Sequence, residues 1–293
     1  MIGVDVGTTK TKTGLFDVDG GLVRLADESY TVHTDGGSGC AEQNPHDWWR
    51  ATCQTLRAVI RDISREEIAA ICVGGQGPTV VMADAEGQPQ CRALLWMDTR
   101  ATAEQAILSE RLGEHVSPYS YIPKIMWIKQ HYPNAYQQSR WCLSAWDFIA
   151  FRLCGRAVSS TYGDHHPFPA RHLEAGRLRT EIAPPAVDIG ATIGKISPAV
   201  VEETGLPSGL NVIAGTNDAM QTFIGGGLTV VGRAIDTGGT GGGFALCWHE
   251  ALDATGSYSG PSIVPGQVVI GGSMNALGKS VDWYLDTFRS TNF

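Results

Sequence analysis

Two glycine-rich turns, one at the start of the chain and one late in it, carry residue types suited to binding phosphate. Residues 5–9 read D-V-G-T-T and residues 236–240 read D-T-G-G-T. Small residues leave backbone N–H groups and threonine hydroxyls open to phosphate oxygens. We therefore predict two phosphate-binding hairpin tips that hold a nucleoside triphosphate from both sides. Two ordinary glycine-rich hairpins are the alternative.

Each turn also carries a carboxylate, Asp5 or Asp236, that could hold Mg²⁺ through water. Lys12 follows the first tip and could contact phosphate, although a solvated strand lysine fits the same pattern. Asp5 is the predicted metal residue. The predicted nucleotide-binding residues are Asp5, Gly7, Thr8, Thr9, Lys12, Gly238, Gly239 and Thr240.

The residues on both sides of each turn predict strands. Apolar residues alternate over 2–6, and further strands are predicted over 13–18 and 22–32, joined by an Asp19-Gly20 turn. The later turn is flanked in the same way by 233–235 and 243–246. A strand–turn–strand unit that occurs twice is stronger evidence for a binding role than either turn alone.

The intervening sequence predicts a mixed α/β fold with an antiparallel start and a parallel continuation. Asn44 and Pro45 are typical of a helix start, and Ser144 with Asp147 resembles a capping pair. The sequence contains neither G-x-G-x-x-G nor G-x-x-x-x-G-K-[ST]. Helices are predicted over 45–60, 99–112, 123–132, 144–154 and 279–289, further strands over 69–75 and 211–214, and a hairpin-like region around Glu86-Gly87 that leads to residues 94–97.

Composition limits the possible partners and the cellular compartment. The net charge of −8 disfavours nucleic-acid binding, which needs basic surfaces. We expect no membrane span and no signal peptide, because no long apolar run occurs and a strand pattern begins at the first residues. The 7 cysteines are scattered and never spaced C-x-x-C, so we predict buried free thiols in a reducing, cytoplasmic compartment. The adjacent histidines 165 and 166 are a poor metal pair.

Several ordered motifs resemble the FGGY family of carbohydrate kinases. Residues 3–9 resemble its first phosphate hairpin, and Glu42-Gln43-Asn44-Pro45 with Trp48-Trp49 resembles its E-Q-x-P…W-W segment. The resemblance continues through W-M-D-T-R at 96–100, Pro123-Lys124 with Trp127, and Gly215-Thr216-Asn217-Asp218. It covers nearly the whole chain.

This resemblance implies an actin-like ATPase (ribonuclease H-like) fold and ATP-dependent, Mg²⁺-assisted phosphorylation of a sugar or polyol hydroxyl, with xylulose favoured. Asp218 matches the family's catalytic base, which accepts the hydroxyl proton; from the residues alone, a solvated turn carboxylate is equally open. Asp98 could instead cap a helix near Thr99, and Trp96 could be a core residue. The implied substrate-binding residues are Gln76, Gly77, Trp96, Asp98, Arg100 and Asp218.

The sequence also departs from xylulokinases. Gly77-Pro78-Thr79 replaces Met-His-Gly, Ala219 replaces an asparagine, and Gly239-Thr240 replaces Thr-Ser. The histidine expected to touch the sugar is therefore missing.

We predict a complete N-terminal sugar-binding lobe over 1–224 and the beginning of a nucleotide-binding lobe over 225–293. The second segment is short for a core of its own, so we expect exposed apolar surface and an open sheet edge there, with the protein a fragment or completed by a partner chain. The family also makes a homodimer plausible. A sugar-binding but catalytically incomplete lobe, or an actin- or Hsp70-like ATPase switch, are the alternatives.

Overall fold

The computed structural model describes residues 1–35, 37–162, 165–236, 242–252, 257–274 and 278–288. The chain divides into two compact units. The first contains residues 1–161 and 166–218, and the second contains 162–165 and 219–293. The mixed α/β class predicted from the sequence is confirmed in the first unit.

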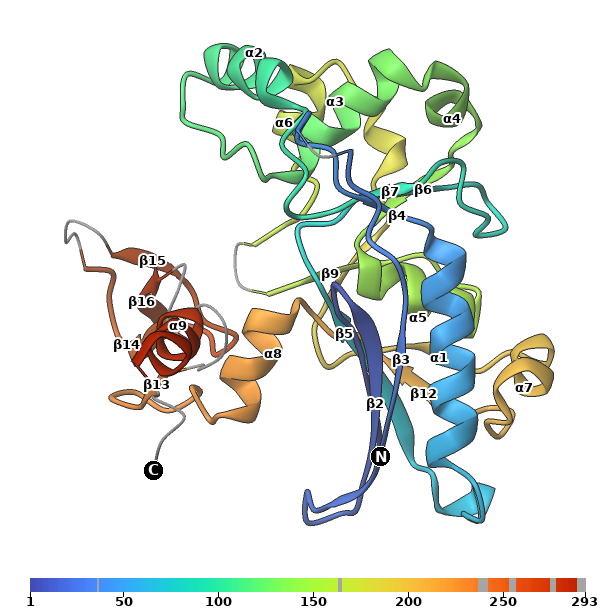
Figure 1. The fold of residues 1–293 in the computed structure, drawn as a ribbon. Helices are drawn as coiled ribbons and strands as arrows, with labels where there is room; N and C mark the ends of the chain where they lie inside the picture. The colour runs from blue at the N-terminus through green and yellow to red at the C-terminus, as the bar shows by residue number, and fades with distance from the viewer. Residues whose placement is uncertain (36, 163–164, 237–241, 253–256, 275–277, 289–293) are drawn as a thin grey trace. The chain divides into compact units, whose positions relative to one another are not determined.

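A six-stranded sheet with the order β11-β12-β5-β1-β2-β3 forms the centre of the first unit (Figure 1). Strands β1 (Ile2–Val6), β2 (Lys10–Phe16) and β3 (Leu22–Ser29) form an antiparallel meander. Strands β5 (Ala70–Gly75) and β12 (Asn211–Ile213) run parallel to β1, and β11 (Thr192–Lys195) closes the sheet antiparallel to β12. The carboxyl ends of β1, β5 and β12 therefore meet at one edge of the sheet.

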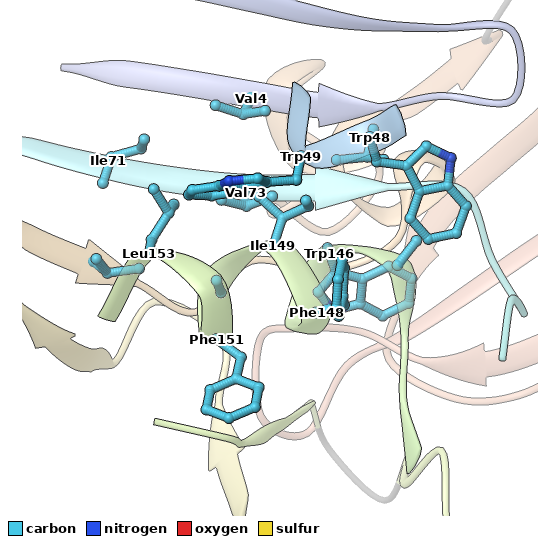
Figure 2. Close-up of a cluster of buried hydrophobic side chains, with 14 of the residues drawn as sticks. Val4, Trp48, Trp49, Ile71, Val73, Trp146, Phe148, Ile149, Phe151 and Leu153 are labelled. Atoms are coloured by element: carbon cyan, nitrogen blue, oxygen red, sulfur yellow. The ribbon is translucent and has the colours of Figure 1, made fainter. Parts of the chain in front are cut away.

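Helices α1 (Pro45–Val59) and α5 (Ala145–Cys154) pack on this sheet and bury its largest core. Figure 2 shows Trp49 of α1 and Ile149 of α5 against Val73 of β5. The predicted start of α1 is confirmed, because the Asn44 side chain accepts a hydrogen bond from the His46 N–H at 3.2 Å. Helix α7 (Pro198–Thr204) packs beside α1.

A second hydrophobic cluster packs together four helices that lie between β5 and β11 in sequence. These are α2 (Thr102–Leu112), α3 (Tyr121–His131), α4 (Pro133–Gln138) and α6 (Ala170–Ala175). The described part of the first unit also contains three two-stranded sheets. They pair β4 (Glu42–Gln43) with β7 (Ala93–Leu94), β6 (Val81–Ala83) with β8 (Trp141–Leu143), and β9 (Ser159–Thr161) with β10 (Ala186–Asp188). Two 3₁₀ turns lie at Arg65–Glu67 and Thr180–Ile182.

The second unit has a four-stranded sheet with the order β13-β14-β16-β15 and the helices α8 (Asp218–Gly225, whose first residue belongs to the first unit) and α9 (Gly278–Phe288). Its strands are β13 (Ala234–Asp236), β14 (Gly242–Trp248), β15 (Tyr258–Pro261) and β16 (Val268–Met274). Within the described residues β13 and β15 each pair on one side only, as expected from the short segment. Five large apolar residues of α9 are exposed: Val281, Trp283, Tyr284, Leu285 and Phe288.

Some expected element details were wrong. The helix predicted from residue 99 begins at Thr102 with Ala101 as its N-cap, so Asp98 does not cap it. Helix α5 begins after Ser144 as predicted, but the Ser144 side chain makes no capping bond. Asp147 instead accepts a 2.6 Å hydrogen bond from the Ser160 hydroxyl. Among the helices within the described ranges, none is long and apolar enough to cross a bilayer.

Candidate active site

Three loops that carry predicted site residues lie at the same edge of the first unit's sheet. Residues 7–9 follow β1, residues 76–79 follow β5, and residues 214–217 follow β12. The loops are joined directly, because Gly75 donates its N–H to Thr216 O at 3.3 Å and Gln76 donates its N–H to Val6 O at 2.9 Å. The parallel strand order thus brings the first hairpin tip, Gln76 and Asp218 together.

The carbonyl groups of the first hairpin tip accept hydrogen bonds from the surrounding protein. Gly7 O accepts from the Tyr30 hydroxyl at 2.6 Å, Thr8 O accepts from Gln43 Nε2 at 2.7 Å, and Thr9 O accepts from the Tyr30 N–H at 3.1 Å. Among the described residues, no acceptor pairs with the amide N–H of Thr8 or Thr9. A turn whose acceptors are satisfied and whose donors are open is suited to bind an anion.

Gly7 itself is needed at this turn. Its N–H donates to Lys10 O at 3.1 Å, and a Cβ atom added to Gly7 would lie 3.0 Å from that same oxygen. The turn is therefore tight around the backbone, and a larger residue would push against the carbonyl.

Asp5 and Asp218 form an interacting pair of carboxylates in the first unit. Burial raises the pKa of Asp5 above its ordinary value, the Asp218 charge raises it further, and Lys12 lowers it. Lys12 is the register partner of Asp5 on β2 and is exposed. Two carboxylates that repel each other favour the binding of a cation or a proton between them.

Gln76 lies fully buried behind the hairpin tip. Its Nε2 donates to Gln43 Oε1 at 2.8 Å and to Gly7 O at 3.2 Å, while Trp48 Nε1 donates to the same Gln43 oxygen at 3.0 Å. The Oε1 atom of Gln76 is buried and has no partner within the described structure. An orphaned acceptor of this kind fits a ligand hydroxyl at the site.

Asp98 and Arg100 are engaged with the protein rather than open to solvent. The Asp98 carboxylate is fully buried and accepts from the Ala41 N–H at 2.9 Å and from Arg100 Nη2 at 2.7 Å. Arg100 also donates to Glu42 Oε1 at 2.7 Å, and its Cζ lies 4.2 Å from the Trp127 ring centroid. These ion pairs raise the pKa of Arg100 although burial opposes this.

Trp96 and Gly77 are two further predicted substrate-binding residues. Trp96 is 40% exposed, and its Nε1 donates to Thr8 Oγ1 at 3.0 Å, which links the W-M-D-T-R segment to the hairpin tip. A Cβ atom on Gly77 would lie 2.8 Å from Trp146 Cζ3, so the indole ring fills the space that a side chain would need.

The structure therefore brings together most of the predicted residues: Asp5, Gly7, Thr8, Thr9, Gln76, Gly77, Trp96 and Asp218. Gly238, Gly239 and Thr240 lie outside the described residues, between β13 and β14, which pair as the predicted hairpin. Sequence reasoning gave no role to Tyr30, and to Gln43 only a place in a motif. Gln43 is signalled by its position just before the Asn44 cap, whereas Tyr30 has no local signal.

Comparisons with known proteins agree with this architecture. A family model, the N-terminal domain of the FGGY family of carbohydrate kinases, matches residues 1–166. A xylulose kinase of Bacillus subtilis (strain 168) is 27% identical over 311 aligned positions, covering 98% of this chain and 62% of that protein. The chain therefore spans less than two thirds of the length of the curated relatives it matches.

Solved structures share the fold. A xylulose kinase from Rhodospirillum rubrum superposes with a TM-score of 0.86 at 23% identity, over 99% of this chain and 64% of that one. A gluconate kinase from Lactobacillus acidophilus gives 0.85 at 21% identity, over 99% and 63%. The predicted actin-like fold, with an N-terminal lobe and the start of a second lobe, is confirmed. Because the family model matches more than half of the sequence, the chain belongs to the FGGY family of carbohydrate kinases.

Proposed function

We propose that the protein transfers the γ-phosphoryl group of ATP to a hydroxyl of a sugar or polyol, with a ketopentose such as xylulose as the preferred acceptor. The observation that supports this proposal is the shared edge of β1, β5 and β12, where a turn with open N–H donors lies near the interacting Asp5 and Asp218 carboxylates. Family membership and the xylulose kinases among the relatives support the substrate class.

Asp218 acts as the general base in this proposal. The acceptor oxygen forms a bond to phosphorus, the bond from phosphorus to the ADP oxygen breaks, and the hydroxyl proton passes to the Asp218 carboxylate. Asp218 is the first residue of α8.

The first hairpin provides the phosphate and metal contacts. We assign the open N–H groups of Thr8 and Thr9 to phosphate oxygens, with Gly7 allowing close approach and Lys12 adding a positive charge. Asp5 would hold Mg²⁺ through water, and one or two carboxylates with phosphate oxygens form a usual Mg²⁺ site. The bound cation would neutralise phosphate charge. Gly238, Gly239 and Thr240 are assigned to the second tip.

The acceptor would contact Gln76, Gly77 and Trp96. The orphaned Gln76 Oε1 would accept a sugar hydroxyl, and the exposed indole face of Trp96 would pack on sugar C–H groups. Asp98 and Arg100 would support acceptor binding by holding the segment that carries Trp96 in place.

The wider organisation is also part of the proposal. We assign residues 1–224 to the sugar-binding lobe and 225–293 to the beginning of the nucleotide-binding lobe, and we propose a homodimer that light scattering would detect. All 7 cysteines are free, which agrees with a reducing, cytoplasmic location.

The test measures ADP release by the complete gene product that contains this chain, against ketoses, aldonates and polyols. Asp218→Asn should lower kcat by about 10²- to 10⁴-fold because the base is lost, with sugar affinity nearly unchanged. Asp188→Asn, at an exposed position of β10, is the matched control and should keep full activity.

Two results would overturn the proposal. Turnover by Asp218→Asn within about threefold of wild type would remove Asp218 from the chemistry. Calorimetric sugar binding without any sugar-stimulated ADP release would instead establish a binding lobe that does not turn over ATP.

A further inference from the structure

Lys124 is a fully buried lysine in the first turn of α3. Its Nζ donates to Leu95 O at 2.7 Å and to Pro78 O at 2.9 Å, and it lies 3.4 Å from Trp96 O. All three acceptors are backbone carbonyls. Burying an ammonium group costs free energy, and hydrogen bonds such as these three offset part of that cost.

The three carbonyls belong to the two segments that carry the proposed acceptor contacts. Pro78 follows Gln76 and Gly77 in the loop after β5, and Leu95 and Trp96 follow β7. Lys124 donates hydrogen bonds to both segments. It therefore sets the position of one segment against the other.

Helix α3 is a rigid support for this side chain. Ile122, Ile125 and Ile128 are buried in the second hydrophobic cluster, which fixes the helix in place. One turn after Lys124, Trp127 stacks on Arg100, which is tied to the buried Asp98. The same helix thus holds the W-M-D-T-R segment at two points.

We propose that Lys124 is a positioning residue for the acceptor site, fixing the loop after β5 and the segment at Trp96 in one relative arrangement. The link extends further, because Trp96 Nε1 donates to Thr8 Oγ1 on the hairpin tip. The catalytic part of this inference rests on the proposed kinase function.

The arrangement depends on the charge of Lys124. An ammonium group has three N–H donors for three carbonyls, whereas a neutral amine has two. Burial lowers the pKa of Lys124 to about 7, and the Asp98 charge opposes this. Asp98, from the segment after β7, is the acid that faces it, and Arg100 forms ion pairs with both Asp98 and Glu42. Lys124 is therefore charged below pH 7 and loses a donor as the pH rises above it.

The first test measures KM for the acceptor and kcat from pH 6 to 9 with the complete gene product. Wild type should show KM rising several-fold above pH 7. Lys124→Met should raise KM about tenfold at pH 6, change KM for ATP less, and remove the rise of acceptor KM with pH. Lys129→Met, at an exposed position of the same helix, should behave as wild type.

The second test needs neither a variant nor a known sugar. Amide hydrogen exchange at Gly77, Thr79, Trp96 and Met97 in wild type, corrected for the intrinsic effect of pH, should accelerate between pH 6.5 and 8.5. Unchanged protection there, together with parallel KM profiles for wild type and Lys124→Met, would overturn the positioning role. Failure to phosphorylate any sugar, with the exchange change present, would overturn the kinase function and leave the positioning role standing.

Discussion

At the residue scale, buried ionisable groups in the first unit are held by backbone donors or acceptors as much as by opposite charges. Lys124 donates to carbonyl groups, and Asp98 accepts from the Ala41 N–H as well as from Arg100. Asp147 is a third case, because it accepts hydrogen bonds from the Ser160 hydroxyl at 2.6 Å and the Ser160 N–H at 3.3 Å, and no cation among the described residues pairs with it. Burial shifts the pKa of Lys124 and of Asp147, so these two groups make stability depend on pH.

Asp147 gives a prediction with a defined sign. Burial raises its pKa from 3.8 to about 7, although the bonds from Ser160 oppose this. The folded state therefore holds a proton that the unfolded state loses between pH 4 and 7, so stability falls as the pH rises through this window. The loss is at most about 4 kcal/mol above pH 7. Urea unfolding of the wild type at pH 5 and pH 8 measures it.

Asp147→Asn is the decisive comparison because asparagine has no charge to bury. The substitution removes one of the two hydrogen bonds from Ser160. This should lower the free energy of unfolding by about 1 kcal/mol at pH 5, where Asp147 of the wild type is protonated. At pH 8 the variant should be the more stable protein. Equal pH slopes for the two proteins would show that Asp147 does not titrate in this window.

Some residues around the site could be predicted from the sequence, and others could not. Asn44 was predicted as a cap because capping depends only on neighbouring residues, and the structure confirms it. The Ser144 side chain makes no capping bond, and Asp147 accepts a hydrogen bond from Ser160, 13 positions away, a contact that no local pattern encodes. The same holds for Tyr30, which reaches Gly7 across the sheet. Residues that support a site through tertiary contacts leave little trace in one sequence.

At the element scale, Arg100 joins three parts of the first unit. It pairs with Glu42 on β4, with Asp98 after β7, and with the Trp127 ring on α3. The helix predicted over 99–112 would include Arg100, whereas α2 begins only at Thr102 and the Arg100 side chain is 14% exposed. The predicted strands and the main helices were found because alternation and helical periodicity are local signals. The three-residue strands β6 and β8 were not predicted, because so few residues give little alternation.

Arg100→Ala should destabilise the protein strongly. The substitution leaves the fully buried Asp98 carboxylate without its cation, and an uncompensated buried charge costs about 3–5 kcal/mol. A guanidinium chloride titration should show a clearly lower midpoint.

Arg50→Ala is the matched control, because Arg50 forms a 3.0 Å ion pair with Glu28 in which both side chains are largely exposed. Its loss should cost about 1 kcal/mol or less. If both variants lost the same stability, the Arg100 network would be no stronger than a surface pair.

At the scale of the whole molecule, the two units differ in how well they bury apolar surface. The first unit has two large hydrophobic clusters, whereas the described core of the second contains Leu228, Ala245, Cys247 and Val269 with a few half-buried neighbours. The sequence predicted this difference from segment length, since about 70 residues seldom supply a sufficient core alone.

The exposed face of α9 leads to the last prediction. Trp283 and Phe288 are 62% and 60% exposed and lie on one helix with three other exposed apolar residues, a patch that attracts an apolar dye such as ANS. In the 293-residue chain, Trp283→Gln combined with Phe288→Gln should reduce ANS fluorescence by about half. The unfolding of the first unit should be unchanged. Ile107→Gln, at a single exposed apolar position on α2, should leave the dye signal intact. Because the dye reports accessible apolar surface, a wild-type chain that bound no ANS would mean that α9 is covered in solution.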